Sequence, residues 1–308
     1  MGTLISWEAL KTKQYESPLF WIQNYICEAG VTFFFGASSL GKSPLTWSMA
    51  KAIGTGTPWF GLPVRQGRVL YIDVDSPERV AAARLQQQVP AQNVWFLFSP
   101  RLSVQLDIPE TEAMISHARE VVRPDVVFIN TLRNVHDLDD KDSRTAKIVY
   151  SAFHRWFPNT ALVFVHHPRK RPTHQNIKED PRETASGTLA FVNDAQIGIM
   201  LRSKNNKTRT MELLHQKSQV GPLVGALPLT LGIDGSTFTC PAWDELKIVY
   251  EIFNEEKLKN TPDSTIDKLV AAKLGFSPAT ARRRREYLES YGPVPPWSLI
   301  SSLTEDSE

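Results

Sequence analysis

The stretch VTFFFGASSLGKSPL, beginning at Val31, limits the fold of this 308-residue chain more than any other feature. Its first five residues predict a buried strand, and a glycine, four residues and then Gly-Lys-Ser follow at once. This is the spacing of a P-loop, whose backbone N–H groups surround phosphates, with a lysine for charge and a hydroxyl for Mg²⁺. A P-loop also needs a helix after it, and the pattern of residues 45–52 predicts one. The alternative is a glycine-serine turn with an incidental lysine.

We therefore expect ATP and Mg²⁺ as ligands. The candidate nucleotide-binding residues are Gly36, Ala37, Ser38, Ser39, Leu40, Gly41, Lys42, Ser43 and Pro44. Pro44 is compatible with the first turn of a helix, because the N–H that proline lacks has no intrahelical partner there.

Apolar runs and amphipathic stretches alternate from Val31 to about Asp234, which predicts an α/β fold with a mainly parallel sheet covered on both faces. The strand-like runs are residues 31–35, 67–74, 93–98, 124–130, 160–167 and 195–201, and the helical stretches are 44–54, 76–89, 111–122 and 144–157. Residues 208–216 and 225–233 are typical of antiparallel edge strands. Ligands of such sheets bind beyond the carboxyl ends of the strands, where the polar motifs of this chain lie.

The formal net charge of +2 excludes nucleic-acid binding through overall charge, so any such surface has to be local. Cys27 and Cys240 lack metal-ligand spacing and predict no disulfide, which favours a reducing compartment. The N-terminus lacks the layout of a signal peptide, and no apolar run is long enough for a membrane span. We expect a cytoplasmic protein without a membrane partner.

Two carboxylates, Asp73 and Asp75, end the second strand-like run at alternate positions, so both are expected on one face of the sheet. The later one is placed to orient or deprotonate the water that attacks a γ-phosphate. Alternatively, Asp75 or Ser76 caps the helix expected to start at Pro77.

The run PDVVFIN ends in Asn130, where a P-loop enzyme places the carboxylate that holds Mg²⁺ through water. An amide binds that water without adding charge. Hydrolysis is therefore weak, or Asp73 supplies the missing charge, and the candidate metal set is Ser43, Asn130 and Asp73.

His166 and His167 end the next run, where either can sense the γ-phosphate by hydrogen bonding; a purely structural role is the alternative. We expect no metal site from His136, His154, His166, His167 and His174, because no two of them show ligand spacing on one element.

Two segments are locally basic. The loop after the histidine pair carries Arg169, Lys170 and Arg171, which either contact DNA phosphates or belong to a solvated surface loop. The second segment, STIDKLVAAKLGFSPATARRRREYLES, has the helix, glycine turn and basic helix of a helix-turn-helix.

In that second segment Ser277 caps a helix opened by Pro278. The residues expected to reach base edges are Ser277, Ala279, Thr280 and Arg283, and those expected to bind phosphates are Arg282, Arg284 and Arg285. The alternative is a helical protein-interaction module whose arginines pair with the acidic residues that follow.

The order of the P-loop, VLYIDVDSPERV, PDVVFINTLRN, VFVHHPRK and SGTLAFVNDAQIGIML resembles the RecA-like ATPases of the plasmid RepA-type and DnaB-type helicase group, over roughly residues 17–234. The resemblance implies a ring, usually a hexamer, with ATP between subunits and DNA in the channel. It also implies that Asp75 stands where the group has its catalytic glutamate and Asn130 where it has the Walker-B aspartate. Lys217 matches a basic finger that reaches into the neighbour's site, while Gln219 stands where an arginine is often found.

These patterns divide the chain into an N-terminal arm (1–26), a RecA-like ATPase domain (27–238), a winged-helix-like DNA-binding domain (243–300) and a flexible tail (301–308). The favoured function is that of a ring-forming helicase or translocase in a plasmid, phage or mobile-element replication system. An ATP-gated DNA-binding regulator or loader with weak hydrolysis is the alternative. A small-molecule kinase is disfavoured, since no lid segment is found.

Overall fold

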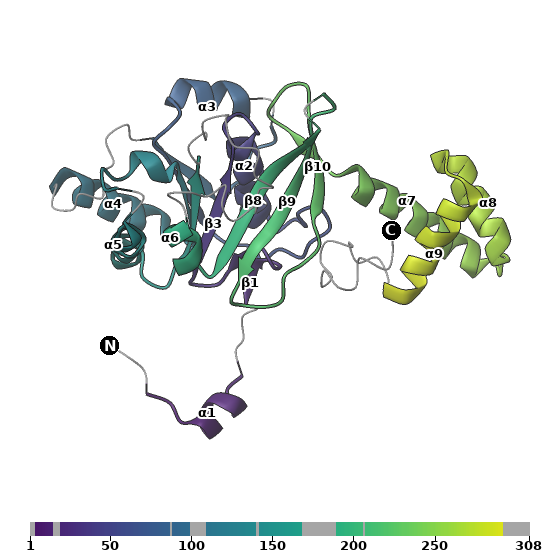
Figure 1. Cartoon of the computed structure of the whole chain (residues 1–308), viewed down its shortest axis with the longest axis horizontal. Coiled ribbons are helices and arrows are strands. Elements are labelled where there is room, and N and C mark those ends of the chain that lie inside the picture. The colour runs from purple at the N-terminus through teal and green to yellow at the C-terminus, as the bar shows by residue number, and fades with distance from the viewer. Residues whose placement is uncertain are drawn as a thin grey trace, which may run out of the picture.

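The computed structural model describes residues 4–14, 19–86, 88–98, 109–139, 142–167, 189–205 and 207–291. The strands of its central sheet are β3 (Val31–Gly36), β4 (Val69–Asp73), β5 (Val94–Phe98), β6 (Val126–Asn130), β7 (Ala161–His166), β8 (Ile197–Asn205), β9 (Thr210–Ser218), β10 (Leu227–Leu231) and β11 (Phe238–Thr239). The strand order is β11-β10-β9-β8-β3-β7-β6-β4-β5 (Figure 1). The six strands from β8 to β5 in this order are parallel, and β9, β10 and β11 pair antiparallel. The predicted α/β fold and its antiparallel edge are confirmed.

Two hydrophobic layers enclose the sheet, because side chains of each strand alternate between its faces. One layer contains Phe34 of β3 and packs against α2 (Lys42–Thr55) and α3 (Glu78–Leu85). The other contains Phe33 and Phe35 and packs against further helices. These are α4 (Pro109–Val122), η1 (Leu132–Asn134), α5 (Ser143–Trp156) and α6 (Leu189–Asp194).

The N-terminal segment forms a short helix and a two-stranded ribbon. Helix α1 (Trp7–Thr12) has no buried residue and lies away from the core (Figure 1). The ribbon pairs β1 (Phe20–Ile22) with β2 (Ile26–Cys27) and belongs to the layer of α2. The Thr32 hydroxyl donates to the carbonyl of Tyr25, so the ribbon packs at the amino end of β3.

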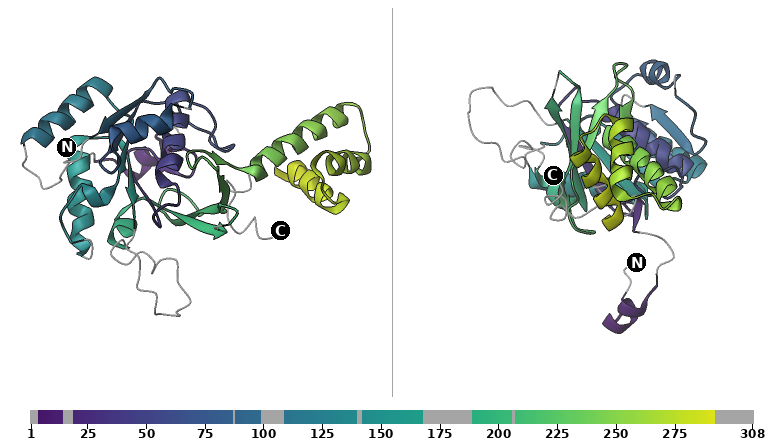
Figure 2. Two further views of the ribbon diagram at one scale, coloured as in Figure 1. Left: turned by 90° about the horizontal axis from the view of Figure 1, so that it is seen from above. Right: turned by 90° about the vertical axis from the view of Figure 1, so that its right-hand side faces the viewer.

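Three helices follow the sheet: α7 (Pro241–Leu258), α8 (Asp263–Leu274) and α9 (Pro278–Tyr291). They extend from the β10 side of the core (Figures 1 and 2) and share a small hydrophobic cluster of their own. Helix α7 begins where the sequence pattern changes from mixed to helical. That these helices form a separate DNA-binding domain stays a prediction. Among the described residues, none of the helices is both long and apolar enough to span a membrane.

The connection between α8 and α9 has the predicted turn chemistry. Gly275 follows α8 with a φ of 69°, a left-handed conformation that favours glycine. The Ser277 Oγ accepts a hydrogen bond from the backbone N–H of Thr280 at 3.2 Å, which caps α9. Residues 240–291 contain no strand that would form a wing.

His215 on β9 makes the stability of this fold sensitive to acid. Burial lowers the pKa of its imidazole to about 4, and within the described structure neither ring nitrogen has a hydrogen-bond partner. Its ring meets that of Tyr25 edge-on at 4.9 Å. The unfolded chain, with a histidine pKa near 6.5, binds a proton that the folded state excludes, so stability falls as the pH drops from about 6.5 to 4.

We expect His215→Phe, which keeps a ring against Tyr25, to remove part of this acid sensitivity. Between pH 6.5 and 4 the wild type should lose up to about 3 kcal/mol more unfolding free energy than the variant. Urea unfolding at each pH measures the difference. His117→Phe, on an exposed position of α4, is the matched control and should keep the wild-type profile. Identical profiles for the wild type and His215→Phe would contradict the assignment.

Candidate functional site

The loop between β3 and α2 has two glycines that no larger residue can replace without strain. A Cβ on Gly36 would lie 2.5 Å from the carbonyl oxygen of Leu201 on the neighbouring strand β8. Gly41 has a φ of 85°, and a Cβ there would lie 2.9 Å from the Phe238 ring. Gly41 directly precedes α2, so the loop leads into a helix N-terminus, as the P-loop pattern predicts.

Lys42 opens α2 and is 2% exposed. Its Nζ donates hydrogen bonds to the carbonyl oxygens of Gly36 at 2.7 Å and Ala37 at 2.6 Å. Burial lowers the pKa of Lys42 to about 7, while the charge of Asp75 opposes the shift. An ammonium held only by neutral carbonyls gains charge-assisted bonds when phosphate oxygens replace them.

Ser43, Asn130 and Asp73 form a connected polar cluster where β6 and β4 end beside α2. Asn130 Nδ2 donates to Ser43 Oγ at 3.2 Å and to Asp73 Oδ2 at 3.3 Å. The two strands place Asp73 and Asn130 directly opposite each other. Asn130 Oδ1 is buried and has no hydrogen-bond partner in the described structure. The predicted metal set is therefore brought together, with one oxygen still unsatisfied.

Asp73 is a buried carboxylate that also shapes the turn after β4. It is 1% exposed, and burial raises its pKa, against hydrogen bonds from the backbone of Ser76 and Asp75 and from Asn130. Its Oδ1 accepts from the backbone N–H groups of Asp75 at 3.0 Å and Ser76 at 2.8 Å. Helix α3 has Pro77 at its N-cap and no side-chain cap bond, so the prediction that Asp75 or Ser76 caps it is wrong.

Asp75 lies outside strand β4. Its side chain lies beside His167, whereas the Asp73 side chain is buried beside Asn130. Strand β4 ends at Asp73, so the alternation that predicted one shared face does not extend to Asp75. The Asp75 side chain is 45% exposed, and its Oδ2 lies 4.0 Å from His167 Nε2. This carboxylate and this imidazole therefore face each other, and the charge of Asp75 acts on the P-loop lysine.

The histidine pair divides between two environments. His166 is the last residue of β7, where alternation turns it into the layer of α5, away from the layer that holds α2. It is 3% exposed, its ring lies 5.7 Å from that of Phe33, and burial lowers its pKa to about 3. His166 therefore faces the layer of α5, and its role as a phosphate sensor stays a prediction. His167 follows the strand, is 30% exposed and lies beside Asp75.

Lys217 lies away from the P-loop of its own chain. It pairs with Gly198 on β8, and Gly198 pairs with Phe33, three residues before Gly36. The Lys217 ammonium donates to the carbonyl oxygen of Asn193 at the end of α6, and burial lowers its pKa. The predicted DNA contacts Arg169, Lys170 and Arg171 lie outside the described residues.

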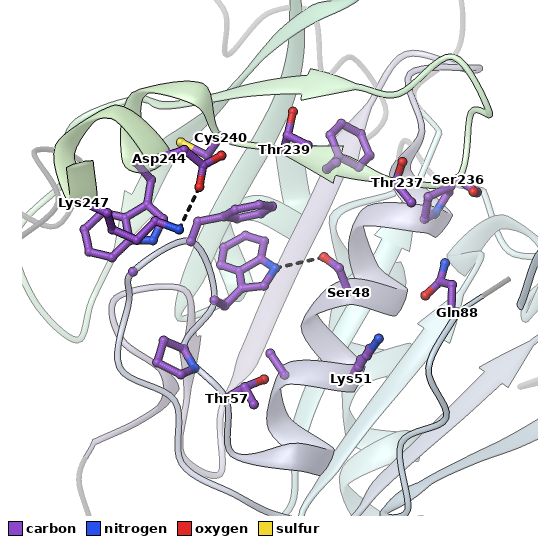
Figure 3. Close-up of a pocket in the computed structure, with 18 residues that line it drawn as sticks. Ser48, Lys51, Thr57, Gln88, Ser236, Thr237, Thr239, Cys240, Asp244 and Lys247 are labelled. Atoms are coloured by element: carbon purple, nitrogen blue, oxygen red, sulfur yellow. Dashed lines mark hydrogen bonds and ion pairs between the residues drawn. The ribbon is translucent and has the colours of Figure 1, made fainter. Parts of the chain in front are cut away.

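A pocket of about 420 Å³ opens along α2 beside the P-loop, between this helix and the start of α7 (Figure 3). Its aromatic walls are Trp59, Phe60, Phe238 and Trp243. Trp59 Nε1 donates to Ser48 Oγ at 2.9 Å, which fixes one wall against α2. Polar groups on the rim include Gln88, Ser236 and Thr237. No sequence pattern predicted this pocket, because its walls come from three separate segments.

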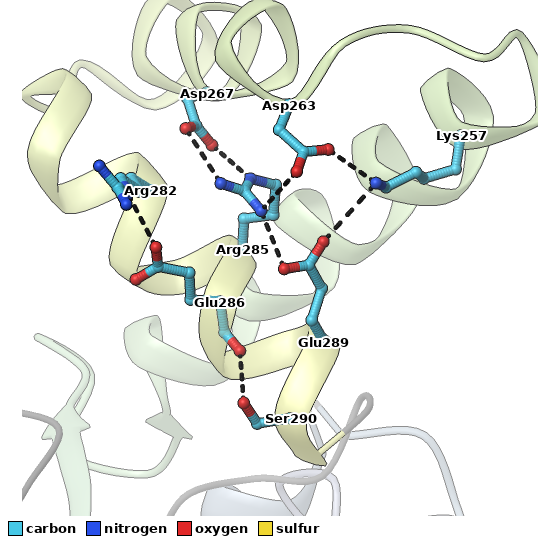
Figure 4. Close-up of polar contacts among 8 residues, drawn as sticks. All are labelled: Lys257, Asp263, Asp267, Arg282, Arg285, Glu286, Glu289 and Ser290. Atoms are coloured by element: carbon cyan, nitrogen blue, oxygen red, sulfur yellow. Dashed lines mark hydrogen bonds and ion pairs between the residues drawn. The ribbon is translucent and has the colours of Figure 1, made fainter.

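Two arginines of α9, Arg282 and Arg285, differ in how far their side chains are exposed and in their ion pairs (Figure 4). The Arg285 side chain is 7% exposed and donates to Asp267 on α8 at 2.8 Å, and to Asp263 and Glu289. Lys257 of α7 joins the same network through Asp263. The expectation that Arg285 binds phosphate is wrong, because its guanidinium joins α8 to α9. The Arg282 side chain is 67% exposed, in an i,i+4 pair with Glu286.

The sequence profile of a family described as AAA domain matches residues 4–173, more than half of the chain. The chain belongs to this family. No curated protein matches it. Together with the sheet and the loop described above, membership identifies this AAA domain protein as having a RecA-like P-loop ATPase core.

Solved structures are similar in fold. The ATPase domain of another protein is 12% identical, with 69% of this chain and 85% of that one covered and a TM-score of 0.51. A DnaB-like replicative helicase, in a structure that describes its interactions with primase, is 14% identical, with coverages of 70% and 58% and a TM-score of 0.51. A KaiC-like protein from Pyrococcus horikoshii is 8% identical, with coverages of 71% and 92% and a TM-score of 0.47. For the first two structures, the likeness at these identities concerns the fold alone.

We expect Gly41→Ala to destabilise the fold more than Gly235→Ala does. Both glycines have positive φ, at 85° and 69°, so alanine at either position is held in a left-handed conformation that costs about 1 kcal/mol. Only Gly41 also places the new Cβ against Phe238, whereas at Gly235 the nearest atom is 3.7 Å away. Thermal unfolding of the two variants measures the difference. Equal losses would mean that the contact with Phe238 does not restrict the loop.

Proposed function

We propose that this protein binds ATP with Mg²⁺ and hydrolyses it. The observation that carries the proposal is the convergence of Lys42, Ser43, Asp73 and Asn130 at the carboxyl ends of three parallel strands. The loop from Gly36 to Pro44 supplies backbone donors, and Lys42 supplies the charge for the outer phosphates.

The pocket beside α2 is the place we propose for the nucleoside. It begins at Pro44, immediately after Ser43, so a ligand whose phosphates lie in the P-loop reaches it directly. Aromatic walls suit a flat base, and the rim of amide and hydroxyl groups suits its polar edge.

Three residues fit a hydrated Mg²⁺. Ser43 Oγ is the direct ligand in our proposal, and Asn130 would turn its unpaired Oδ1 toward the metal's water. Asp73 then supplies, from the neighbouring strand, the negative charge that Asn130 lacks. Magnesium neutralises charge on the β- and γ-phosphates when bound.

Asp75 and His167 are proposed to act on the attacking side. Asp75 would orient or deprotonate the water, and His167 would contact the γ-phosphate, because both side chains are partly exposed and face each other. Lys217 faces away from its own site, which is compatible with a role in the site of a neighbouring copy in a ring such as a hexamer.

We further propose that the C-terminal helices bind DNA. Ser277, Thr280 and Arg283 at the start of α9 would approach base edges, while Arg282 and Arg284 would contact phosphates. The capped turn and the exposure of Arg282 support this assignment. Arg169, Lys170 and Arg171 are proposed as additional phosphate contacts on sequence grounds.

Two functions satisfy these assignments. The first is a DNA helicase or translocase of a plasmid, phage or other mobile element. The second is an ATP-gated DNA-binding regulator or loader, which the neutral Asn130 favours because it weakens the metal site. ATP turnover with and without DNA, together with the mass in solution with ATP bound, separates them. DNA-stimulated turnover by a ring supports the motor, and tight binding without stimulation supports the regulator.

If Asp73 provides the negative charge, transferring the carboxylate from position 73 on β4 to position 130 on β6 should preserve ATP hydrolysis. We expect Asp73→Asn to lower Mg²⁺-dependent turnover by about 10- to 100-fold. The double variant Asp73→Asn with Asn130→Asp should recover most of it, because the carboxylate returns to the same cluster. Turnover over a range of Mg²⁺ concentrations is the measurement.

Lys42→Ala, which should abolish ATP binding, sets the background for that experiment. The single variant Asn130→Asp adds a carboxylate without removing Asp73, and we expect it to raise Mg²⁺-dependent turnover. Full activity of Asp73→Asn, or a double variant no better than the single one, would contradict the role of Asp73.

Because Arg282 is exposed and Arg285 is buried, we expect substitutions of these two arginines to impair different properties, DNA binding and stability. Arg282→Ala should weaken DNA binding and reduce the slope of log affinity against log salt by about 1, with unchanged thermal stability. Arg285→Ala should cost about 3 kcal/mol of stability, because it leaves Asp267 buried without its partner. Binding of duplex DNA at several salt concentrations and thermal unfolding report the two effects. Unchanged DNA binding by Arg282→Ala at every salt concentration would favour a protein-interaction module.

A further inference from the structure

Asn134, the last residue of η1, contacts the segment that carries Asp75. Its Nδ2 donates to the carbonyl oxygen of Val74 at 3.2 Å and to Asp75 Oδ1 at 3.4 Å. The backbone adds a third link, since the N–H of Val74 donates to the carbonyl oxygen of Asn130 at 2.7 Å. The turn after β6 is therefore bonded to the turn after β4 just beyond the end of the sheet.

The position of Asn134 is fixed by its neighbours in the chain. Leu132 and Val135 are fully buried in the layer of α5, and the backbone N–H of Asn134 donates to the carbonyl oxygen of Thr131 at 3.1 Å. The residue itself is exposed, so its amide extends outward from a turn that packing holds in place. A side chain on such a support keeps its partner in one geometry.

The Asp75 carboxylate is partly exposed, so its orientation depends on the groups that contact it. Asp73 fixes the backbone N–H of Asp75, but the Asp75 side chain is 45% exposed. Its two oxygens face different groups: Oδ1 faces the Asn134 amide, and Oδ2 faces His167 at 4.0 Å. The amide thus contacts one oxygen of the carboxylate, and the imidazole lies nearest to the other.

We propose that Asn134 is a positioning residue for ATP hydrolysis: through its amide it holds Asp75 in the orientation that activates the attacking water. This inference rests on the proposed function, in which Asp75 acts on that water. A shift of about 1 Å in a group that orients a reactant changes rates by up to about 100-fold, whereas it changes nucleotide binding little.

The test is a double-mutant cycle on ATP turnover by the full chain. We expect Asn134→Ala to lower kcat by about 10-fold with an unchanged KM for ATP, because in the described structure its amide bonds to Val74 and Asp75 rather than to the P-loop. In the Asp75→Ala background the same change should have an effect of less than about 2-fold, since the residue it positions is gone. Asn134→Gln, which retains an amide donor, should recover part of the lost kcat.

Asn93→Ala is the matched control. Asn93 Nδ2 donates to the carbonyl oxygen of Gly54 at 3.0 Å, so the variant loses a similar amide–carbonyl bond beside the opposite end of β4. Its thermal stability should fall about as much as that of Asn134→Ala, while its kcat stays at the wild-type value. A loss of stability alone therefore does not reproduce the expected result.

The outcomes separate this inference from the function on which it rests. No turnover by the wild type, or full turnover by Asp75→Ala, overturns the proposed chemistry and the inference with it. A slow Asp75→Ala with a fully active Asn134→Ala overturns only the inference. Equal losses from Asn134→Ala in both backgrounds also overturn it, because the amide would then act independently of Asp75.

Discussion

The burial of β3 on both faces is the constraint on which the rest of this structure depends. All six of its residues are buried, and it lies between β7 and β8 in the middle of the sheet. A strand fixed in this way delivers Gly36 to one place, and the approach of Leu201 leaves no room there for a side chain. The loop that follows has to turn sharply into α2, which puts Lys42 and Ser43 at the carboxyl ends of the neighbouring strands.

Around this loop the protein concentrates charge in a small, mostly buried volume. Lys42 is held by carbonyl oxygens, and Asp73 is held by backbone N–H groups and the amide of Asn130. Burial shifts the pKa of Lys42 down and that of Asp73 up, so each group has more to gain from a charged ligand than an exposed one would. A buried lysine and carboxylate near one anion-binding loop fit a phosphate and its metal ion.

Much of the fold followed from the sequence because it rests on local patterns. Continuous apolar runs of five or six residues between turn signals are typical of strands covered on both sides, and their order along the chain predicted the parallel sheet. The Ser277 cap and the Gly275 turn were equally local, and both are confirmed. His166 shows a signal that was present but not used, since its place in the alternation of β7 already turned it into the layer of α5.

The remaining features depend on contacts between distant segments. The run of arginines in the sequence does not distinguish Arg285 from Arg282. In the packed helices, Arg285 pairs with acidic residues of α8, whereas Arg282 pairs with Glu286 of its own helix. The aromatic pocket and the bond from Asn134 to Asp75 likewise join segments that are far apart in the chain. The sequence by itself determined the P-loop spacing, the sheet class and the turn between α8 and α9, because spacing and periodicity specify them locally. Only the tertiary structure decided which carboxylate, histidine and arginine are buried and which stay exposed, because burial and pairing are set by packing between elements.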